Sequence, residues 1–144
     1  MTMTVREAFD KGTTAFNEHD ILAWTEILDD EVVFEAPGLR GEGKTACAEF
    51  YGSWFRAFPD AHVDVHGTHI VDDVAAEEGT FTGTHNGVLH GATGDIPPTG
   101  RSVQVAYIQV IRFRNGKCVS FNLAYDRLSM LEQLGLVPGS GSAQ

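Results

Sequence analysis

Four residues of this sequence have side chains and positions that suit catalysis, two as acid–base groups and two as hydrogen-bond donors. His85 follows a stretch of alternating residues, and an imidazole near its ordinary pKa can take up and release a proton at neutral pH. Tyr107 and Gln109 are two residues apart and could donate hydrogen bonds to a substrate carbonyl. Glu35 could be a base if apolar neighbours raised its pKa. Each of the four also has a structural reading as a satisfied or solvated polar group.

Other polar residues have simpler explanations than chemistry. Asp126 precedes a short helical pattern, so we predict a helix N-cap there rather than a catalytic acid. His62, Asp64 and His66 share one side of a predicted strand and could bind a metal, but that side is expected to face solvent. The two cysteines are isolated from each other in the sequence, which excludes a metal knuckle. We therefore predict no metal site.

The composition limits the kind of partner. Ten Lys and Arg against 20 Asp and Glu give a net charge of −10, which disfavours binding to nucleic acid or to an anionic membrane surface. The sequence has no apolar run long enough to span a bilayer, and Met1–Lys11 does not resemble a signal peptide. A cytoplasmic protein is expected, with one domain over residues 1–137 and a flexible tail over residues 138–144.

Helices dominate the first 60 residues. Thr4 and Glu7 form a capping box before apolar residues at helical spacing, and Asp20 can cap a short second helix. A third helix is predicted from the spacing of Cys47, Phe50, Tyr51, Trp54, Phe55 and Phe58, and it ends at Pro59. One short strand, residues 31–35, lies between the second and third helices and ends at Pro37-Gly38.

Strands dominate the rest of the chain. Alternation predicts strands over residues 62–71, 74–85, 102–114 and 117–125, with tight turns at Asp72-Asp73 and Asn115-Gly116. A last helix is predicted from Asp126 to Leu134. This order of elements indicates an α+β fold in which helices cover one face of a curved, antiparallel or mixed sheet.

The turn at Asn115-Gly116 decides which side chains face the helices, since one extra residue reverses the faces of the next strand. A three-residue loop, 114–116, separates apolar from polar residues better than a two-residue loop, and it would place Gln109 opposite Phe121. The inner face then holds Val103, Val105, Tyr107, Gln109, Ile111, Phe113, Val119, Phe121, Leu123 and Tyr125. Alternation in the earlier strands adds Gly79, Phe81, Gly83, His85, Val63, Val65 and His69.

Glycines on that face are expected to leave room for an internal pocket. We expect its wall to contain Phe16, Tyr51, Trp54, Phe81, Phe121, Leu123 and Tyr125. The Gly- and Pro-rich segment 86–100 should cover the mouth as a mobile lid, with Leu89 and Ile96 turned inward.

Five stretches, taken together and in order, resemble the SnoaL-like polyketide cyclases. They are Ala15-Phe16-Asn17, Ala57-Phe58-Pro59-Asp60, Gly83-Thr84-His85-Asn86-Gly87, Ile96-Pro97-Pro98-Thr99-Gly100-Arg101 and Leu131-Glu132-Gln133-Leu134-Gly135. The resemblance covers about residues 5–136. It implies a conical α+β half-barrel of the nuclear-transport-factor type, commonly dimeric. It also implies a pocket without a cofactor, in which polyketide esters are cyclised by intramolecular aldol chemistry.

The sequence departs from this family at the positions that do the chemistry. The cyclases use an Asp on the last strand as the acid–base group, together with imidazoles on that strand and its neighbour. An ungapped alignment through Asn115-Gly116-Lys117 places Leu123 at the position of the Asp, and Phe121 and Gln109 at the imidazole positions. The family's mechanism therefore cannot be carried over to these residues.

Two classes of function remain open. The first is a cofactor-independent enzyme that cyclises or isomerises a largely apolar or polycyclic, polyketide-like substrate, with hydroxylation or epoxide opening as a variant. It would work by holding the substrate in a reactive conformation. The second is a non-catalytic ligand-binding or dimer-scaffold domain. An enzyme should direct His85 or Glu35 into the pocket.

A homodimer is expected through an outer strip of Ala106, Ile108 and Val110.

Overall fold

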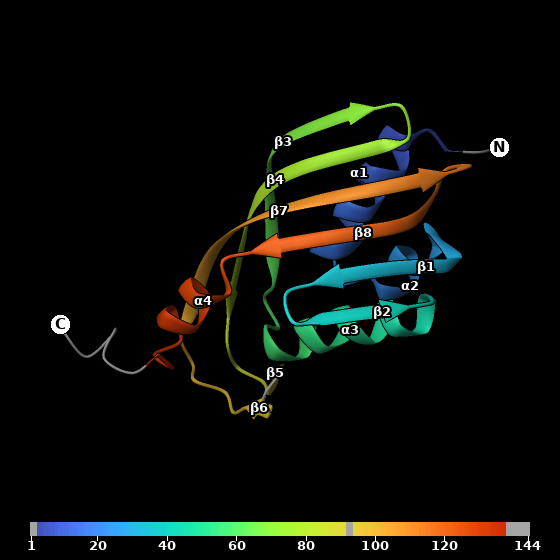
Figure 1. The fold of residues 1–144 in the computed structure, drawn as a ribbon. Helices are drawn as coiled ribbons and strands as arrows, with labels where there is room; N and C mark the ends of the chain where they lie inside the picture. Colours follow the sequence, from blue (N-terminus) through green and yellow to red (C-terminus); the bar gives the residue numbers. More distant parts are fainter. Residues whose placement is uncertain (1–2, 92–93, 138–144) are drawn as a thin grey trace.

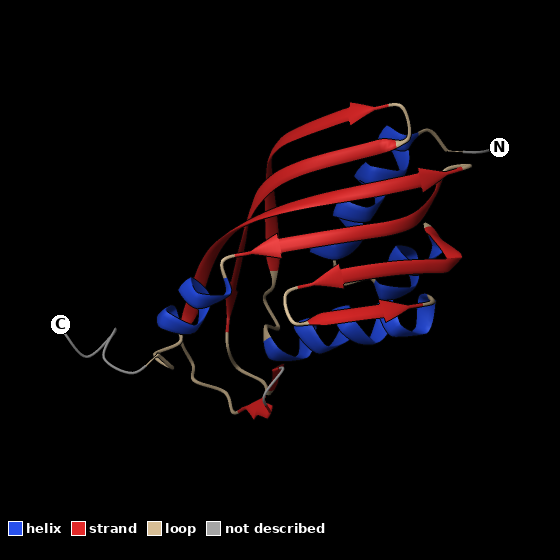
Figure 2. Ribbon diagram, viewed as in Figure 1, coloured by secondary structure: helices blue, strands red, loops and turns tan. Residues whose placement is uncertain are grey.

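A strongly curved sheet wraps around three helices, and a fourth helix follows the last strand (Figures 1 and 2). The computed structural model describes residues 3–91 and 94–137, so the predicted tail 138–144 lies outside the described residues. The helices are α1 (Val5–Asn17), α2 (Ile21–Glu26), α3 (Lys44–Ala57) and α4 (Arg127–Gln133). The large sheet contains β1 (Leu28–Ala36), β2 (Leu39–Glu42), β3 (His62–Val71), β4 (Val74–Thr84), β7 (Ser102–Arg114) and β8 (Lys117–Tyr125).

The strand order across this sheet is β2-β1-β8-β7-β4-β3. All neighbours are antiparallel except β1 and β8, which are parallel, so the sheet is mixed. A separate two-stranded hairpin consists of β5 (Leu89–Gly91) and β6 (Gly94–Ile96). This architecture confirms the α+β fold with a curved mixed sheet that the sequence predicts.

The helix ends follow their capping residues. The Thr4 hydroxyl accepts a hydrogen bond from the Glu7 N–H at 3.1 Å, and the Glu7 carboxylate accepts one from the Thr4 N–H at 2.9 Å. This capping box fixes the start of α1. Asp20 and Asp126 each accept a hydrogen bond from the N–H three residues further on, at 3.0 and 2.9 Å, and so cap α2 and α4. The predicted caps are confirmed.

The first strand is longer than predicted and has two partners that the sequence pattern did not reveal. The predicted strand 31–35 extends to Leu28–Ala36, and the chain turns at Pro37-Gly38 into β2. On its other side β1 pairs with β8, with Phe34 opposite Phe121. The parallel pairing brings an early strand against the last one, which no local signal indicates.

The hairpin between β7 and β8 corrects the predicted register. Its turn has two residues, Asn115 and Gly116, with φ values of 52° and 75°, as a type I′ turn requires. The three-residue loop is therefore wrong. A β-bulge instead leaves Val119 without a partner, because Arg112 pairs with Ser120 while Phe113 pairs with Cys118.

The bulge supplies the extra residue that the loop was expected to supply. The predicted face is therefore kept, but Gln109 lies opposite Leu123 rather than Phe121. Val119 does not belong to the inner face, and the buried Cys118 takes that position instead.

A second bulge corrects the predicted face of β3. Val65 pairs with Gly79, but Gly67 pairs with Glu78, so His66 is the extra residue. Residues beyond the bulge change faces. His69, expected on the inner face, is exposed, and its Nε2 lies 3.8 Å from a Glu78 carboxylate oxygen.

The glycines of β4 accommodate aromatic rings and do not leave empty space. A Cβ on Gly79 would lie 2.5 Å from the Tyr107 hydroxyl oxygen, and a Cβ on Gly83 would lie 3.0 Å from the Phe58 side chain. Real Cβ atoms do not approach as closely as the contact at Gly79, so that position requires glycine while the Tyr107 ring stays in place. At Gly83 a Cβ would need the Phe58 ring to move by a few tenths of an ångström. The expectation that they open a pocket is wrong at these two positions.

None of the helices within residues 3–91 and 94–137 is long and apolar enough to span a membrane.

Candidate functional site

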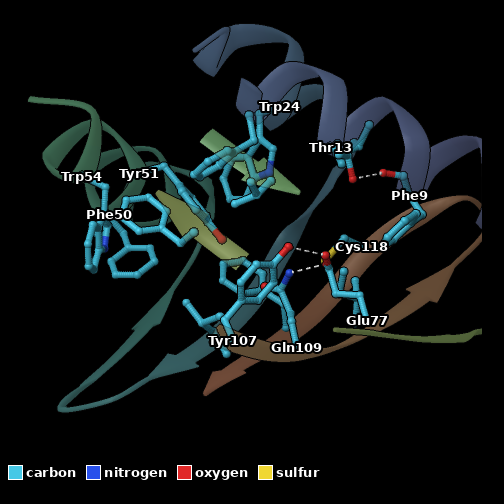
Figure 3. Close-up of a pocket in the computed structure, with 18 of the residues that line it drawn as sticks. Phe9, Thr13, Trp24, Phe50, Tyr51, Trp54, Glu77, Tyr107, Gln109 and Cys118 are labelled. Carbon is cyan, nitrogen blue, oxygen red and sulfur yellow. Dashed lines mark hydrogen bonds between the residues drawn. The ribbon is translucent and has the colours of Figure 1, made fainter. Parts of the chain in front are cut away.

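A cavity of about 120 Å³ lies between the concave face of the sheet and the helices, and Figure 3 shows its wall. Helices α1, α2 and α3 supply most of one side of this wall, and strands β4, β7 and β8 supply most of the other, with single residues from β1, β3 and α4. The wall is mostly aromatic and aliphatic. Seven side chains expected to bind substrate lie in it: Phe16, Tyr51, Trp54, Phe81, Phe121, Leu123 and Tyr125.

Glu77 is the one carboxylate in the wall among the described residues. It stands on β4, and only 5% of the residue is exposed. The Tyr107 hydroxyl donates a hydrogen bond to its Oε2 at 2.8 Å, and Gln109 Nε2 donates one to its Oε1 at 2.7 Å (Figure 3). The structure thus brings the predicted Tyr107 and Gln109 together on an acid that the sequence analysis did not name.

The surroundings of Glu77 act on its ionisation in opposite directions. Burial raises the pKa of the carboxyl group above its ordinary value, and the hydrogen bonds from Gln109 and Tyr107 lower it in part. Both partners donate, so the ionised form has a donor at each oxygen. A carboxylate held in this way is a stronger base than one in water and can take a proton from a group placed in the cavity.

Tyr51 provides a possible hydrogen-bond donor on the helical side of the cavity. Figure 3 shows its hydroxyl directed toward the side where Tyr107 lies, and it makes no hydrogen bond to any residue within the described ranges. Burial raises the pKa of the Tyr51 hydroxyl well above its usual range. The hydroxyl therefore keeps its proton at neutral pH and can donate a hydrogen bond to an oxygen of a bound molecule.

His85 lies outside the cavity wall. The residue is fully buried, its ring centroid lies 5.5 Å from that of Phe58, and Nδ1 accepts a hydrogen bond from the Thr99 N–H at 3.2 Å. Nε2 has no hydrogen-bond partner among the described residues. Burial lowers the pKa of the ring. The structure therefore places this histidine in the packing of the loops and does not bring it to Tyr107 or Gln109.

Glu35 is also separate from the cavity. Its side chain is exposed at the end of β1, and a carboxylate oxygen lies 3.7 Å from Arg40 Nη1. Neither His85 nor Glu35 therefore lines the cavity, and Glu35 has the solvated, strand-end position that was its structural reading.

A simple signal for Glu77 was present in the sequence. The alternation that runs back from His85 through Gly83 and Phe81 to Gly79 reaches Glu77 in one more step. A glutamate is expected to face solvent, so an inward position for it was itself a sign of a functional site.

A larger groove of about 650 Å³ adjoins the cavity. The two share the side chains of Phe50, Trp54, Tyr125 and Met130. Leu89 and Ile96, which were expected to turn toward the pocket, line this outer groove from the β5–β6 hairpin and do not reach the inner cavity. The hairpin therefore stands at the groove rather than over Glu77.

No group of three or more His, Cys, Asp or Glu side chains in the described ranges is arranged to hold a metal ion. Within the trio that was considered for a metal, His62 Nε2 lies 3.2 Å from an Asp64 carboxylate oxygen, whereas His66 Nε2 contacts the Thr80 hydroxyl at 2.6 Å.

Comparison with known proteins relates this fold and cavity to one family. The family model described as SnoaL-like polyketide cyclase matches residues 6–134. No protein among the curated sequences matches the chain.

Solved structures share the fold at low sequence identity. A candidate SnoaL-like polyketide cyclase from Jannaschia sp. CCS1 is 19% identical with a TM-score of 0.82, over 93% of each chain. AclR, a candidate hydroxylase from Streptomyces galilaeus, is 22% identical with a TM-score of 0.80, over 93% of this chain and 82% of AclR. IdmH, a candidate polyketide cyclase from Streptomyces antibioticus, is 23% identical with a TM-score of 0.78, over 92% of this chain and 99% of IdmH.

Proposed function

Because the chain belongs to the SnoaL-like polyketide cyclase family, we propose that it is a cofactor-independent enzyme that moves a proton on a largely apolar, polyketide-like substrate, with Glu77 as the acid–base group. The observation that carries the proposal is the Glu77 carboxylate, buried in an apolar wall and held by two hydrogen-bond donors. Buried carboxylates with a raised pKa are typical of active sites.

The reaction that suits these groups begins at a carbon next to a carbonyl. Glu77 takes the proton from that carbon, so the C–H bond breaks and an O–H bond forms on the carboxyl group. The electron pair moves into an enolate, whose oxygen can accept a hydrogen bond from the Tyr51 hydroxyl. The enolate carbon then bonds to a second carbonyl of the same molecule, whose oxygen takes the proton from Glu77, or the enolate is reprotonated at another position by Glu77.

Glu77 could act in place of the aspartate that the family has at the position of Leu123. Glu77 lies opposite Gln109 on the neighbouring strand, and Gln109 lies opposite Leu123 on the strand after that. The three residues form one row across β4, β7 and β8. An acid–base group on β4 can therefore face the same cavity as one at Leu123 would, from two strands away.

The size of the inner cavity limits what can reach Glu77. A cavity of about 150 Å³ in another protein holds one benzene molecule, and the inner cavity here is about 120 Å³. The inner cavity therefore has room for at most one ring of a substrate beside Glu77, and the remainder would lie in the outer groove. Holding both parts of a flexible chain in this way would favour ring closure by proximity.

Replacing Glu77→Gln tests the proposal, with Glu78→Gln as the matched control. Both are single carboxylates on β4, but Glu78 is exposed on the outer face. Deuterium uptake into 2-tetralone in D₂O, followed by NMR, measures proton removal next to a carbonyl without knowledge of the natural substrate. We expect Glu77→Gln to slow the catalysed uptake by about 10²–10⁴-fold, the usual contribution of a general base, and Glu78→Gln to leave it unchanged.

Thermal melts of both variants show whether a loss of exchange reflects chemistry or unfolding. A Glu77→Gln protein that exchanges as fast as the wild type would refute proton transfer by this residue. If the wild type itself binds 2-tetralone but does not accelerate exchange, the non-catalytic ligand-binding reading is favoured instead.

A further inference from the structure

The outer groove has a charge opposite to that of the whole chain. The chain carries a net charge of −10. The groove wall nevertheless contains Arg40, Arg56 and Arg127, and Glu49 is its one carboxylate among the described residues. This local excess of positive charge in a concave surface attracts anions.

Two of these arginines have no acidic partner. Arg40 is paired with Glu35 at 3.7 Å, as described above. Arg56 makes no ion pair within residues 3–91 and 94–137, and Arg127 donates only a long hydrogen bond of 3.5 Å to the Pro37 carbonyl oxygen. The guanidinium groups of Arg56 and Arg127 are thus available to a ligand.

The groove and the cavity form neighbouring compartments of different character. Trp54 and Tyr125 belong to both walls, so a molecule with a ring beside Glu77 would pass these side chains as it extends outward. Arg56 lies on α3, the same helix as Trp54, and Arg127 begins α4 just after Tyr125. The shared residues therefore lead from the apolar cavity directly to the arginines.

We propose that the outer groove binds an oxyanion group, carboxylate or phosphate, at the far end of the substrate whose ring occupies the inner cavity, and that Arg56 and Arg127 hold it. A guanidinium group offers paired N–H donors that match both kinds of oxyanion. This inference rests on the proposed function for the location of the ring, but it depends on residues that take no part in the proton transfer.

Binding of simple amphiphiles tests the proposal without turnover. The probes are ω-phenylalkanoates from 3-phenylpropionate to 8-phenyloctanoate, their primary amides and the corresponding phenylalkyl phosphates, measured by calorimetry at low salt. We expect the anions to bind about tenfold more tightly than the amide at one or more chain lengths, which is the size of a charged hydrogen bond. The relative affinities of carboxylate and phosphate identify which oxyanion the groove prefers.

Two variants test whether the preference for the anion over the amide arises in the groove. Arg56→Gln with Arg127→Gln should abolish the difference between anion and amide. Arg112→Gln, which removes an exposed arginine of β7 outside the groove, should retain it. Equal binding of anion and amide at every chain length would overturn the proposal, as would an equal loss in the Arg112→Gln control.

Glu77→Gln separates this inference from the proposed function. It should slow deuterium uptake as described above while the preference for the anion remains. If it leaves uptake unchanged, the proposed function fails, and the comparison of anion and amide still decides whether the groove binds an oxyanion.

Discussion

The ionisation of Glu77 depends on Gln109 and Tyr107, its two hydrogen-bond donors. Burial raises the pKa of Glu77, and of the two donors Gln109 lowers it more. Gln109→Leu removes that donor, so the pKa of Glu77 should rise further. A base works only when ionised, and the rate rises with pH through its pKa. The rise in deuterium uptake into 2-tetralone should therefore move to higher pH in Gln109→Leu.

Tyr125→Phe is the control for this change. Tyr125 lines the same cavity but makes no hydrogen bond to Glu77. Its pH profile should match that of the wild type. A Gln109→Leu profile that stays in place or moves to lower pH would contradict the assignment of Glu77 as the base.

Alternation along a strand predicts which face a residue occupies, but not what the residue does there. It placed Tyr107 and Gln109 on the inner face, where the structure has them in contact with Glu77. The same alternation placed His85 on the inner face, but β4 ends at Thr84 and His85 lies beyond it. Glu35 is exposed at the end of β1. Glu77 follows the same alternation, but glutamate usually faces solvent, so the pattern alone does not indicate that this side chain is buried.

At the scale of elements, His85 holds the two ends of the segment between β4 and β7. Its N–H donates to the Arg101 carbonyl oxygen at 2.9 Å, and its own carbonyl oxygen accepts from the Gly100 N–H at 2.8 Å. The ring adds the hydrogen bond to Thr99. His85→Ala removes a fully buried ring and this bond, so we expect the free energy of unfolding to fall by about 2–4 kcal/mol.

Proton exchange by the folded His85→Ala protein should stay within a few-fold of the wild type, because the ring is outside the cavity wall. Urea unfolding and deuterium uptake measure the two effects separately. His66→Ala, at an exposed histidine of β3, should change neither. If His85→Ala loses proton exchange while its stability is unchanged, His85 takes part in the proton transfer.

Local signals were enough to predict most elements of this fold. Strands β3, β7 and β8 begin and end where alternation and turns indicate, and β4 ends one residue earlier. The bulges at His66 and Val119 were not predicted, because the partner strand decides where an extra residue is tolerated. The same holds for β2 and for the parallel pairing of β1, which depend on residues far away in the sequence.

At the scale of the whole molecule, we propose that two copies pair through the outer face of the sheet. Ile108 is 55% exposed there and lies opposite Ala124 on β8. Two-fold pairing would cover this apolar strip. Light scattering at micromolar concentration should give twice the mass of the chain, and Ile108→Lys should give a monomer with unchanged proton exchange. A monomer mass for the wild type would refute the pairing.

The parallel contact between β1 and β8 also determines when the fold can be completed during synthesis. Phe34 of β1 stacks on Phe121 of β8 with ring centroids 5.2 Å apart, and Trp24 packs edge-on against the same ring at 5.8 Å. Helices α1–α3 and strand β1 leave the ribosome long before β8 does. The apolar side chains that pack against β8 therefore stay exposed until most of the chain has been made. Contacts between such distant residues slow folding. The wall of the cavity cannot be complete before β8 has been made, so changes at this contact should first appear as a lower yield of folded protein.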